Sequence, residues 1–378
     1  MLIVPKFFLI FSLVCGFASN VKQMLAFRFL AGLGACAPQT VGSGVLSDLW
    51  TPEQRGMALA IYTMSPIAGP ALGPLIGAWI TERTTWRWSF WAITIFGVTV
   101  QILVYFTLHE TYAPRILHWR ARKLRKETGN DNFQTVYERA DKGNIKIVLR
   151  RALTRVFIFL ATQPIAQFLA LYIALIYGIV FLLLYSFPMV WSRIYHMSTG
   201  IGGLNYISLL IGFTVGGQSS GRLLDLLYRR FKRLKRFSPD GQGHPEFRVP
   251  ILWMSTFLVS GGLFMFGWSA QAHTHWIVPN IGALIFGIGA IMTFTALQAY
   301  TIDCYQLYAA SAVGVTAMSR SAAGFGFPLF ADSMFAALGQ GWGNSVLAFA
   351  AIGIGYSGST VLWFWGPKLR AASNYAAA

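Results

Sequence analysis

Ten long apolar segments constrain this chain more than any other feature of its sequence. An α-helix needs about 20 apolar residues to cross the hydrocarbon core of a bilayer. Segments of that kind lie at residues 3–20, 24–46, 57–80, 88–108, 165–190, 203–221, 250–270, 276–299, 309–330 and 343–365. The strands of a membrane barrel would instead show about ten residues of alternating polarity, a pattern that these segments lack. The sequence therefore predicts an all-α polytopic membrane protein with about ten transmembrane helices.

The composition supports the same class. Hydrophobic residues make up 55% of the 378 residues and charged residues only 11%, whereas soluble domains carry roughly 25% charged residues. A soluble core could not bury so much apolar surface. The composition therefore excludes a soluble enzyme and a disordered tail.

Basic charge is concentrated in two of the connecting segments. Twelve of the 30 Lys and Arg residues lie between Arg115 and Arg155, and eight lie between Arg222 and Arg248. Under the positive-inside rule, this pattern places both segments and both termini in the cytoplasm. It also accounts for the net charge of +17 without nucleic-acid binding. A signal peptide at the first apolar segment is the alternative, and it would put the basic segments outside the cell.

The apolar segments form a group of four and a group of six. Many transporters consist of two six-helix halves. We therefore expect an incomplete N-terminal bundle of four helices at 1–108, a basic cytoplasmic linker at 109–164, and a C-terminal six-helix bundle at 165–378 with a basic loop at 222–249. On this interpretation the chain is N-terminally truncated relative to a protein of twelve helices.

A glycine- and proline-rich run marks the third apolar segment. Gly69, Gly73 and Gly77 share one face of a helix at i, i+4 and i+8, and Pro70 follows the first of them. Such a face allows close helix packing, and a proline bends a helix because it lacks the backbone donor. The alternative is ordinary small-residue packing with no further role.

Charged residues within apolar segments are candidates for proton coupling or for lining a cavity. Arg28 and Arg320 lie inside their segments, and Asp303 lies near the cytoplasmic end of another. A charge at such a position is costly unless it faces a cavity or a partner. The alternatives are an Arg28 that reaches the membrane surface, an Arg320 that hydrogen-bonds backbone carbonyls, and an interfacial Asp303.

Two further sets of residues carry candidate roles. A cytoplasmic charge latch, which would stabilise one state of alternating access, is expected from Gly217, Gly221, Arg222, Asp225, Arg229 and Arg230. A solvated capping cluster is the alternative. A substrate cavity lined by polar aromatic and amide side chains is expected from Tyr172, Tyr177, Tyr185, Gln298 and Tyr300. Each of these five residues could equally serve packing.

The sequence offers no arrangement for catalysis. It shows no Ser-His-Asp set, no paired catalytic carboxylates and no Gly-x-x-x-x-Gly-Lys-Ser/Thr run for ATP. Its six histidines lie in or near loops, and they form no metal-binding helix face. We therefore expect no enzymatic activity, no cofactor and no metal, and we expect an ion gradient to supply the energy.

Several runs together resemble one protein family. The Gly69–Gly77 run resembles the fifth-helix antiporter motif of the major facilitator superfamily. The run that starts at Arg28 resembles its fourth-helix motif, whose arginine is implicated in proton coupling. With Trp86-Arg87-Trp88-Ser89-Phe90-Trp91 and Pro245-Glu246-Phe247-Arg248-Val249-Pro250, these runs resemble the fungal twelve-helix drug:proton antiporters, in the branch of polyamine and multidrug exporters.

The resemblance implies a major facilitator fold and proton-coupled efflux of a small organic molecule: a drug, toxin, polyamine or fungal secondary metabolite. The partners it implies are that substrate, protons and the lipid bilayer, for a monomer in the plasma membrane. In that family, two helices and a Gly-x-x-x-Asp-Arg-x-Gly-Arg-Arg loop precede the segment that opens this chain, and no such run occurs before residue 20. The alternative function is a truncated remnant or membrane sensor that does not transport.

Overall fold

Every regular element in the described residues is a helix. The computed structural model describes residues 3–49, 69–70, 72–107, 113–129, 135, 145–234, 243–305 and 308–373. The chain divides into two compact units, Met1–Val148 and Leu149–Ala378. The prediction of an all-α polytopic fold is confirmed.

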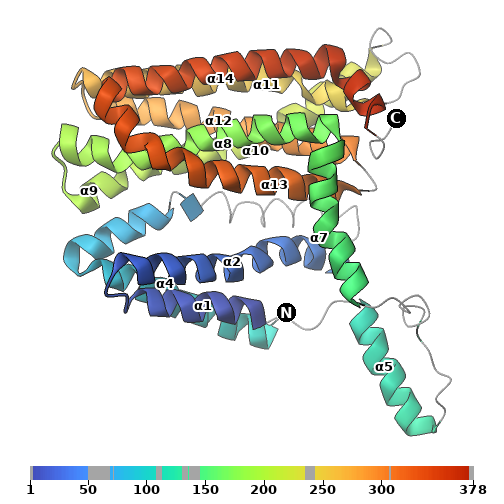
Figure 1. Cartoon of the computed structure of the whole chain (residues 1–378). Helices are drawn as coiled ribbons and strands as arrows, with labels where there is room; N and C mark the ends of the chain where they lie inside the picture. The colour runs from blue at the N-terminus through green and yellow to red at the C-terminus, as the bar shows by residue number, and fades with distance from the viewer. Residues whose placement is uncertain are drawn as a thin grey trace. The chain divides into compact units, whose positions relative to one another are not determined.

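Among its described residues, the N-terminal unit contains four helices with defined bounds and a further helical stretch. The helices are α1 (Ile3–Cys15), α2 (Val21–Leu49), α4 (Trp86–Thr107) and α5 (Ala113–Thr128), and the further stretch covers 72–83 (Figure 1). Helix α1 packs against α2 and α4. Asn20 precedes α2, and its side-chain oxygen accepts a hydrogen bond of 2.8 Å from the backbone N–H of Gln23. This cap satisfies one of the free donors in the first turn of α2.

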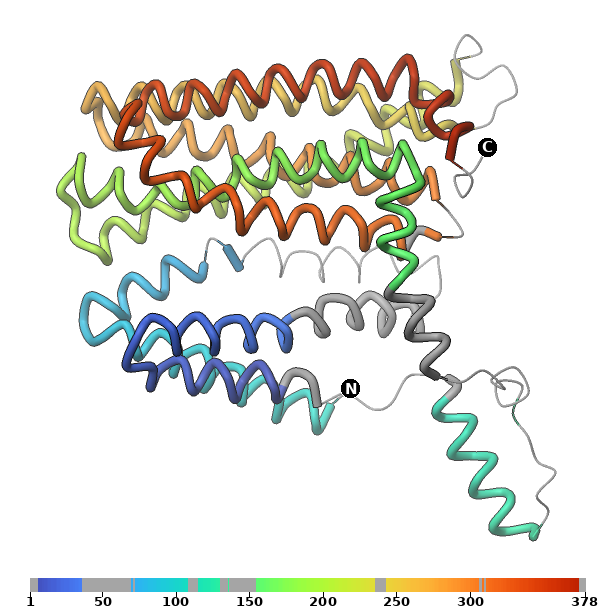
Figure 2. The backbone as a smooth tube through the Cα atoms, in the orientation of Figure 1, coloured from blue at the N-terminus to red at the C-terminus, as the bar shows by residue number. Residues whose placement is uncertain are grey.

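The C-terminal unit is built around six long helices. They are α8 (Pro164–Met189), α10 (Tyr206–Arg233), α11 (Pro250–Gln271), α12 (Ile277–Cys304), α13 (Ala309–Gly326) and α14 (Ala331–Ala371). Helix α7 (Ile145–Thr162) leads into them, and the short elements are η1 (Val190–Ile194), α9 (Thr199–Leu204), η2 (Pro245–Arg248) and η4 (Phe327–Phe330). Successive long helices run in opposite directions (Figure 2). Helix α11 packs against α12 and α14, α10 against α12, and α13 against α8.

Small residues allow these helices to approach closely. A Cβ atom added to Gly262 of α11 would lie 2.4 Å from the backbone nitrogen of Phe286 on α12. Helices in a membrane gain little from the hydrophobic effect between them, so such backbone contacts contribute much of their packing. Gly262 is therefore required where α11 and α12 meet.

Six stretches of the described residues are long and apolar enough to span a membrane. The last of them, Ser311–Ala371, holds two of the segments expected from the sequence, 309–330 and 343–365. The first expected segment corresponds to a shorter apolar helix, Lys6–Cys15. Most of the expected segment 57–80 lies outside the described residues.

Parts of the two basic stretches, for which the sequence predicts a linker and a loop, are helical. Helices α5 and α7 fall within 109–164, and α10 continues through Arg233 into 222–249. Hydropathy marks only the part of a helix that can cross a bilayer. Leucine, arginine and lysine are good helix formers, and they extend the helices beyond that part.

Helix α14 is interrupted at Gly339. This residue has φ 70° and ψ −178° inside an otherwise helical stretch, a conformation that is essentially restricted to glycine. The second part of α14 then starts with a cap, because the side-chain oxygen of Gln271 accepts a hydrogen bond of 2.7 Å from the backbone N–H of Gly341.

The end of α8 is also irregular. Pro188 lies inside the last turn of α8, and the chain continues as the π-helical turn η1. Proline removes one backbone donor from the helical ladder, and a π-turn is a common local adjustment in helices.

Candidate functional site

Two acidic–basic pairs meet around the short helix η2, next to the ends of α12 and α14. We call this set the η2 ion-pair cluster. It consists of Glu246, Arg248, Tyr300, Asp303 and Arg370. Three of its members, Glu246, Tyr300 and Arg370, are buried.

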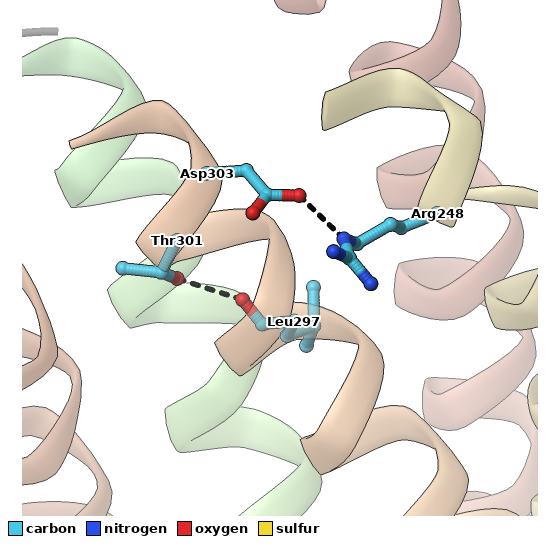
Figure 3. Close-up of polar contacts among 4 residues, drawn as sticks. All are labelled: Arg248, Leu297, Thr301 and Asp303. Atoms are coloured by element: carbon cyan, nitrogen blue, oxygen red, sulfur yellow. Dashed lines mark hydrogen bonds and ion pairs between the residues drawn. The ribbon is translucent and has the colours of Figure 1, made fainter. Parts of the chain in front are cut away.

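The first pair joins Arg248 of η2 to Asp303 of α12. The Arg248 Nε donates a hydrogen bond to Asp303 Oδ2, and the two side chains are 18% and 27% exposed (Figure 3). The guanidinium carbon of Arg248 also lies 5.0 Å from the ring centroid of Tyr228 on α10. The structure therefore gives the predicted proton-coupling candidate Asp303 a basic partner, which the sequence analysis did not identify.

The second pair joins Glu246 of η2 to Arg370 of α14. Arg370 Nη2 lies 3.1 Å from both carboxylate oxygens of Glu246. The Tyr300 hydroxyl of α12 donates a further hydrogen bond of 3.3 Å to Glu246 Oε1. The two charged side chains are only 9% and 8% exposed. Both charged groups are shielded from water, so each needs the opposite charge of the other to offset the free-energy cost of its burial.

The local sequence explains how one turn serves both pairs. Pro245 begins η2 and Pro250 begins α11, so two fixed φ angles flank a single 3₁₀ turn. Between Glu246 and Arg248, the Phe247 side chain is buried and packs against Phe231, with ring centroids 5.8 Å apart. The buried phenylalanine anchors the turn, and its two charged neighbours reach different helices.

A second set surrounds Arg320 of α13. Its guanidinium carbon lies 5.1 Å from the ring centroid of Tyr177 on α8. The Tyr177 ring in turn lies 4.8 Å from that of Phe181 and 5.6 Å from that of Phe294 on α12. Among the described residues, the buried Nε of Arg320 has no hydrogen-bond partner. We call Arg320, Tyr177, Phe181 and Phe294 the Arg320 cluster.

The other predicted cavity residues have different surroundings. Tyr172 is buried, and its hydroxyl donates to the carbonyl of Gly355 on α14 at 3.2 Å. Tyr300 is engaged by Glu246, whereas Gln298 is exposed on α12. The structure thus brings Tyr177 together with Arg320, but it places Tyr172 and Tyr300 in separate packed contacts.

Tyr185 leads to a carboxylate that the sequence analysis missed. Its hydroxyl donates a hydrogen bond of 2.7 Å to Asp332 Oδ2, in the first turn of α14. Asp332 falls between two expected apolar segments, so hydropathy gave no reason to select it.

In the N-terminal unit, Arg28 of α2 contacts an aromatic ring. Its guanidinium carbon lies 5.3 Å from the ring centroid of Phe90 on α4. This cation–π contact offers the charge a partner within an apolar helix pair.

The predicted antiporter run is only partly described. Gly69 and Pro70 are helical, and Gly73 and Gly77 lie on the stretch 72–83. Added Cβ atoms at these three glycines would meet nothing within 4 Å among the described residues.

The predicted charge latch lies along α10. Arg222, Asp225, Arg229 and Arg230 are all exposed, and they line a shallow surface depression. Within the part of the chain that the structure describes, no salt bridge joins Asp225 to either Arg222 or Arg229. The role of these residues as a latch stays a prediction.

Comparison with known proteins decides the family. The profile of the Major Facilitator Superfamily matches residues 2–328. The chain belongs to the major facilitator superfamily. It is 44% identical to "Efflux pump vrtL" of Penicillium aethiopicum over 98% of this chain and 72% of that protein. It is 37% identical to "MFS-type transporter oryF" of Aspergillus oryzae over 97% of this chain and 75% of that one.

Solved structures show the same fold for this major facilitator protein. A D-xylose–proton symporter structure matches with a TM-score of 0.63 and 15% identity, over 96% of this chain and 80% of that chain. A peptide transporter structure matches with a TM-score of 0.63 and 13% identity, over 98% and 80%. At these identities the likeness concerns the fold alone.

Two buried charged residues of this major facilitator protein, Glu246 and Arg370, were not predicted from the sequence as site residues. Glu246 lies in the Pro245–Pro250 run that carried part of the family resemblance, and Arg370 follows the last apolar segment. They are 124 residues apart in sequence. A glutamate between two prolines beside an apolar segment was the available signal, but nothing in the sequence pointed to its partner.

Proposed function

We propose that this chain is a proton-coupled efflux transporter for small organic molecules, of the drug, toxin, polyamine or fungal secondary metabolite classes. The observation that carries the proposal is the 44% identity, over 98% of the chain, to a protein named an efflux pump. The Gly-Pro run at Gly69–Gly77, which resembles the antiporter motif, supports the direction of transport.

Proton coupling rests on two features of the chain. The sequence contains no run that would bind the phosphates of ATP, so an ion gradient is the remaining source of energy. Charged side chains lie within or at the ends of apolar helices, and such positions are costly without a function. Arg28, Arg320 and Asp303 are the candidates.

The Arg320 cluster is the proposed substrate contact of the C-terminal bundle. Arg320 has an unpartnered Nε among the described residues and stacks on an aromatic group. Aromatic faces bind hydrophobic and weakly cationic molecules. Arg320 would then hold the position of these rings and respond to the charge of what binds there.

The proposed topology places both termini in the cytoplasm of a monomer in the plasma membrane. The positive-inside distribution supports the orientation. The segments 1–108 and 165–378 would form the two helical halves, joined by the basic linker 109–164. The charge set along α10 would lie at the cytoplasmic surface, where it could act as the latch.

Cells that produce the transporter test the proposal directly. We expect lower accumulation of a hydrophobic or cationic dye than in control cells, and a protonophore should abolish the difference. Depletion of ATP at a maintained proton gradient should leave the difference intact. Dependence on ATP with indifference to the proton gradient would overturn the mechanism.

The efflux assay can also compare two lengths of the protein. The chain aligns with 72% of the Penicillium relative, and the absence of two preceding helices stays a prediction. Two forms should therefore be compared, the 378-residue chain and a form extended upstream by two such helices. Efflux by the extended form alone would support the prediction, whereas equal efflux by both would contradict it.

A further inference from the structure

Helix α5 combines basic charge with exposed apolar side chains. Its 16 residues hold six Lys and Arg and one acidic residue, Glu127. Four large apolar side chains of α5 are exposed by 36–51%: Ile116, Leu117, Trp119 and Leu124. A helix of this composition is unsuited both to a bilayer core and to bulk water.

Three apolar residues of α5 share one face of the helix. Leu117, Ala121 and Leu124 recur at i, i+4 and i+7, which is one face of a helix. Ala121 in the middle of this face is buried, and the two leucines beside it remain 40% and 36% exposed. Arg122 and Lys126 lie on the opposite side by the same helical spacing.

The chain also fixes where α5 begins. Helix α4 is long and apolar enough to span a membrane and ends at Thr107, and α5 begins at Ala113. Six residue steps reach at most about 20 Å. The first turn of α5 therefore starts within about 20 Å of the end of α4, close to the headgroups of the bilayer that α4 crosses.

We propose that α5 is an interfacial helix that binds the anionic phospholipids of the cytoplasmic leaflet. The inference rests on the proposed topology, which puts α5 on the cytoplasmic side. Basic amphipathic helices lie in the plane of the membrane, with apolar side chains among the acyl chains and cations at the lipid phosphates. Anionic lipids of the inner leaflet supply the complementary charge.

A spin label reports the environment of α5 in the full chain. Cys15, Cys36 and Cys304 are replaced by alanine, Leu117→Cys on the apolar face is labelled, and the protein is reconstituted into vesicles of phosphatidylcholine with or without phosphatidylserine. We expect the label to be accessible to oxygen and protected from a water-soluble nickel chelate when phosphatidylserine is present. This protection should be lost in phosphatidylcholine alone and at high salt.

Two variants separate charge from folding. Arg120, Arg122 and Lys126 are exposed on α5, and their joint replacement by glutamine should abolish the protection. The combined substitutions Arg120→Lys, Arg122→Lys and Lys126→Arg keep the charge and should preserve the protection from nickel. The proposal would be overturned if the label were accessible to the nickel chelate in phosphatidylserine vesicles, or if it were shielded from both oxygen and the chelate. Equal protection in vesicles with and without phosphatidylserine would also overturn it.

A separate experiment tests whether α5 lies on the cytoplasmic side of the membrane. A membrane-impermeant maleimide applied to intact cells should not reach Leu117→Cys, and it should react after permeabilisation. Reaction in intact cells would refute the cytoplasmic placement itself. A label that is cytoplasmic but stays in water would refute only the lipid contact.

Discussion

Arg320 is a residue whose role can be inferred from the free energy needed to place a charge inside an apolar helix. A charge inside an apolar helix is unfavourable unless it is partnered, and this arginine has a ring contact to Tyr177 but an unpartnered Nε among the described residues. We expect Arg320→Ala to reduce transport at least tenfold, which is about 1.4 kcal/mol of lost stabilisation, without loss of membrane insertion.

Matched variants make the Arg320 experiment specific. Arg193→Ala removes an exposed arginine at the end of η1 and should leave transport near the wild-type level. Efflux is measured at equal surface expression. Equal efflux by the Arg320→Ala and Arg193→Ala proteins would contradict a role for Arg320 in the cavity.

The buried ion pair of Glu246 predicts how its removal changes the stability of the fold. Replacement by leucine leaves the Arg370 guanidinium buried without its carboxylate, and breaking a buried pair in this way costs about 3–5 kcal/mol. We expect a clearly lower midpoint of thermal unfolding in detergent. The double variant Glu246→Leu/Arg370→Met should recover most of the lost unfolding midpoint, because both charges are then absent. No recovery in the double variant would show that the pair does not account for the effect.

At the scale of elements, the irregular turn in α14 can be tested through Gly339. Its φ of 70° and ψ of −178° fall in a region that only glycine adopts easily, and other residues there are strained by about 1–3 kcal/mol. Gly339→Ala should therefore lower the unfolding midpoint. Gly353→Ala, in a regular part of the same helix with nothing within 4 Å of the added Cβ, is the control. An equal effect of both variants would contradict the strain argument.

The elements were largely predictable, and their ionic contacts were not. Apolar runs of about 20 residues predict helices because the bilayer imposes that length. Arg320 was found because it interrupts such a run. The pairs Glu246–Arg370 and Arg248–Asp303 link residues 124 and 55 positions apart. No periodicity connects residues that meet only after the bundle has packed, and the helical parts of 109–164 were missed because they are amphipathic rather than apolar.

At the scale of the whole molecule, the proposed orientation predicts which ends of the helices face the cytoplasm. Lys232 lies near the end of α10, and His275 lies between α11 and α12. In a background without the native cysteines, His275→Cys should react with an impermeant maleimide in intact cells, and Lys232→Cys should react only after permeabilisation. The opposite pattern would reverse the orientation and contradict the charge argument.

The η2 ion-pair cluster has a mechanical consequence for the C-terminal bundle. The short turn η2 joins the ends of α12 and α14 through Glu246 and Arg248. At the opposite ends of α8 and α14, the backbone is interrupted by the π-turn after Pro188 and by Gly339. We therefore expect bending of this bundle to occur at its irregular end, and we expect the helix ends joined by the ion pairs to move together.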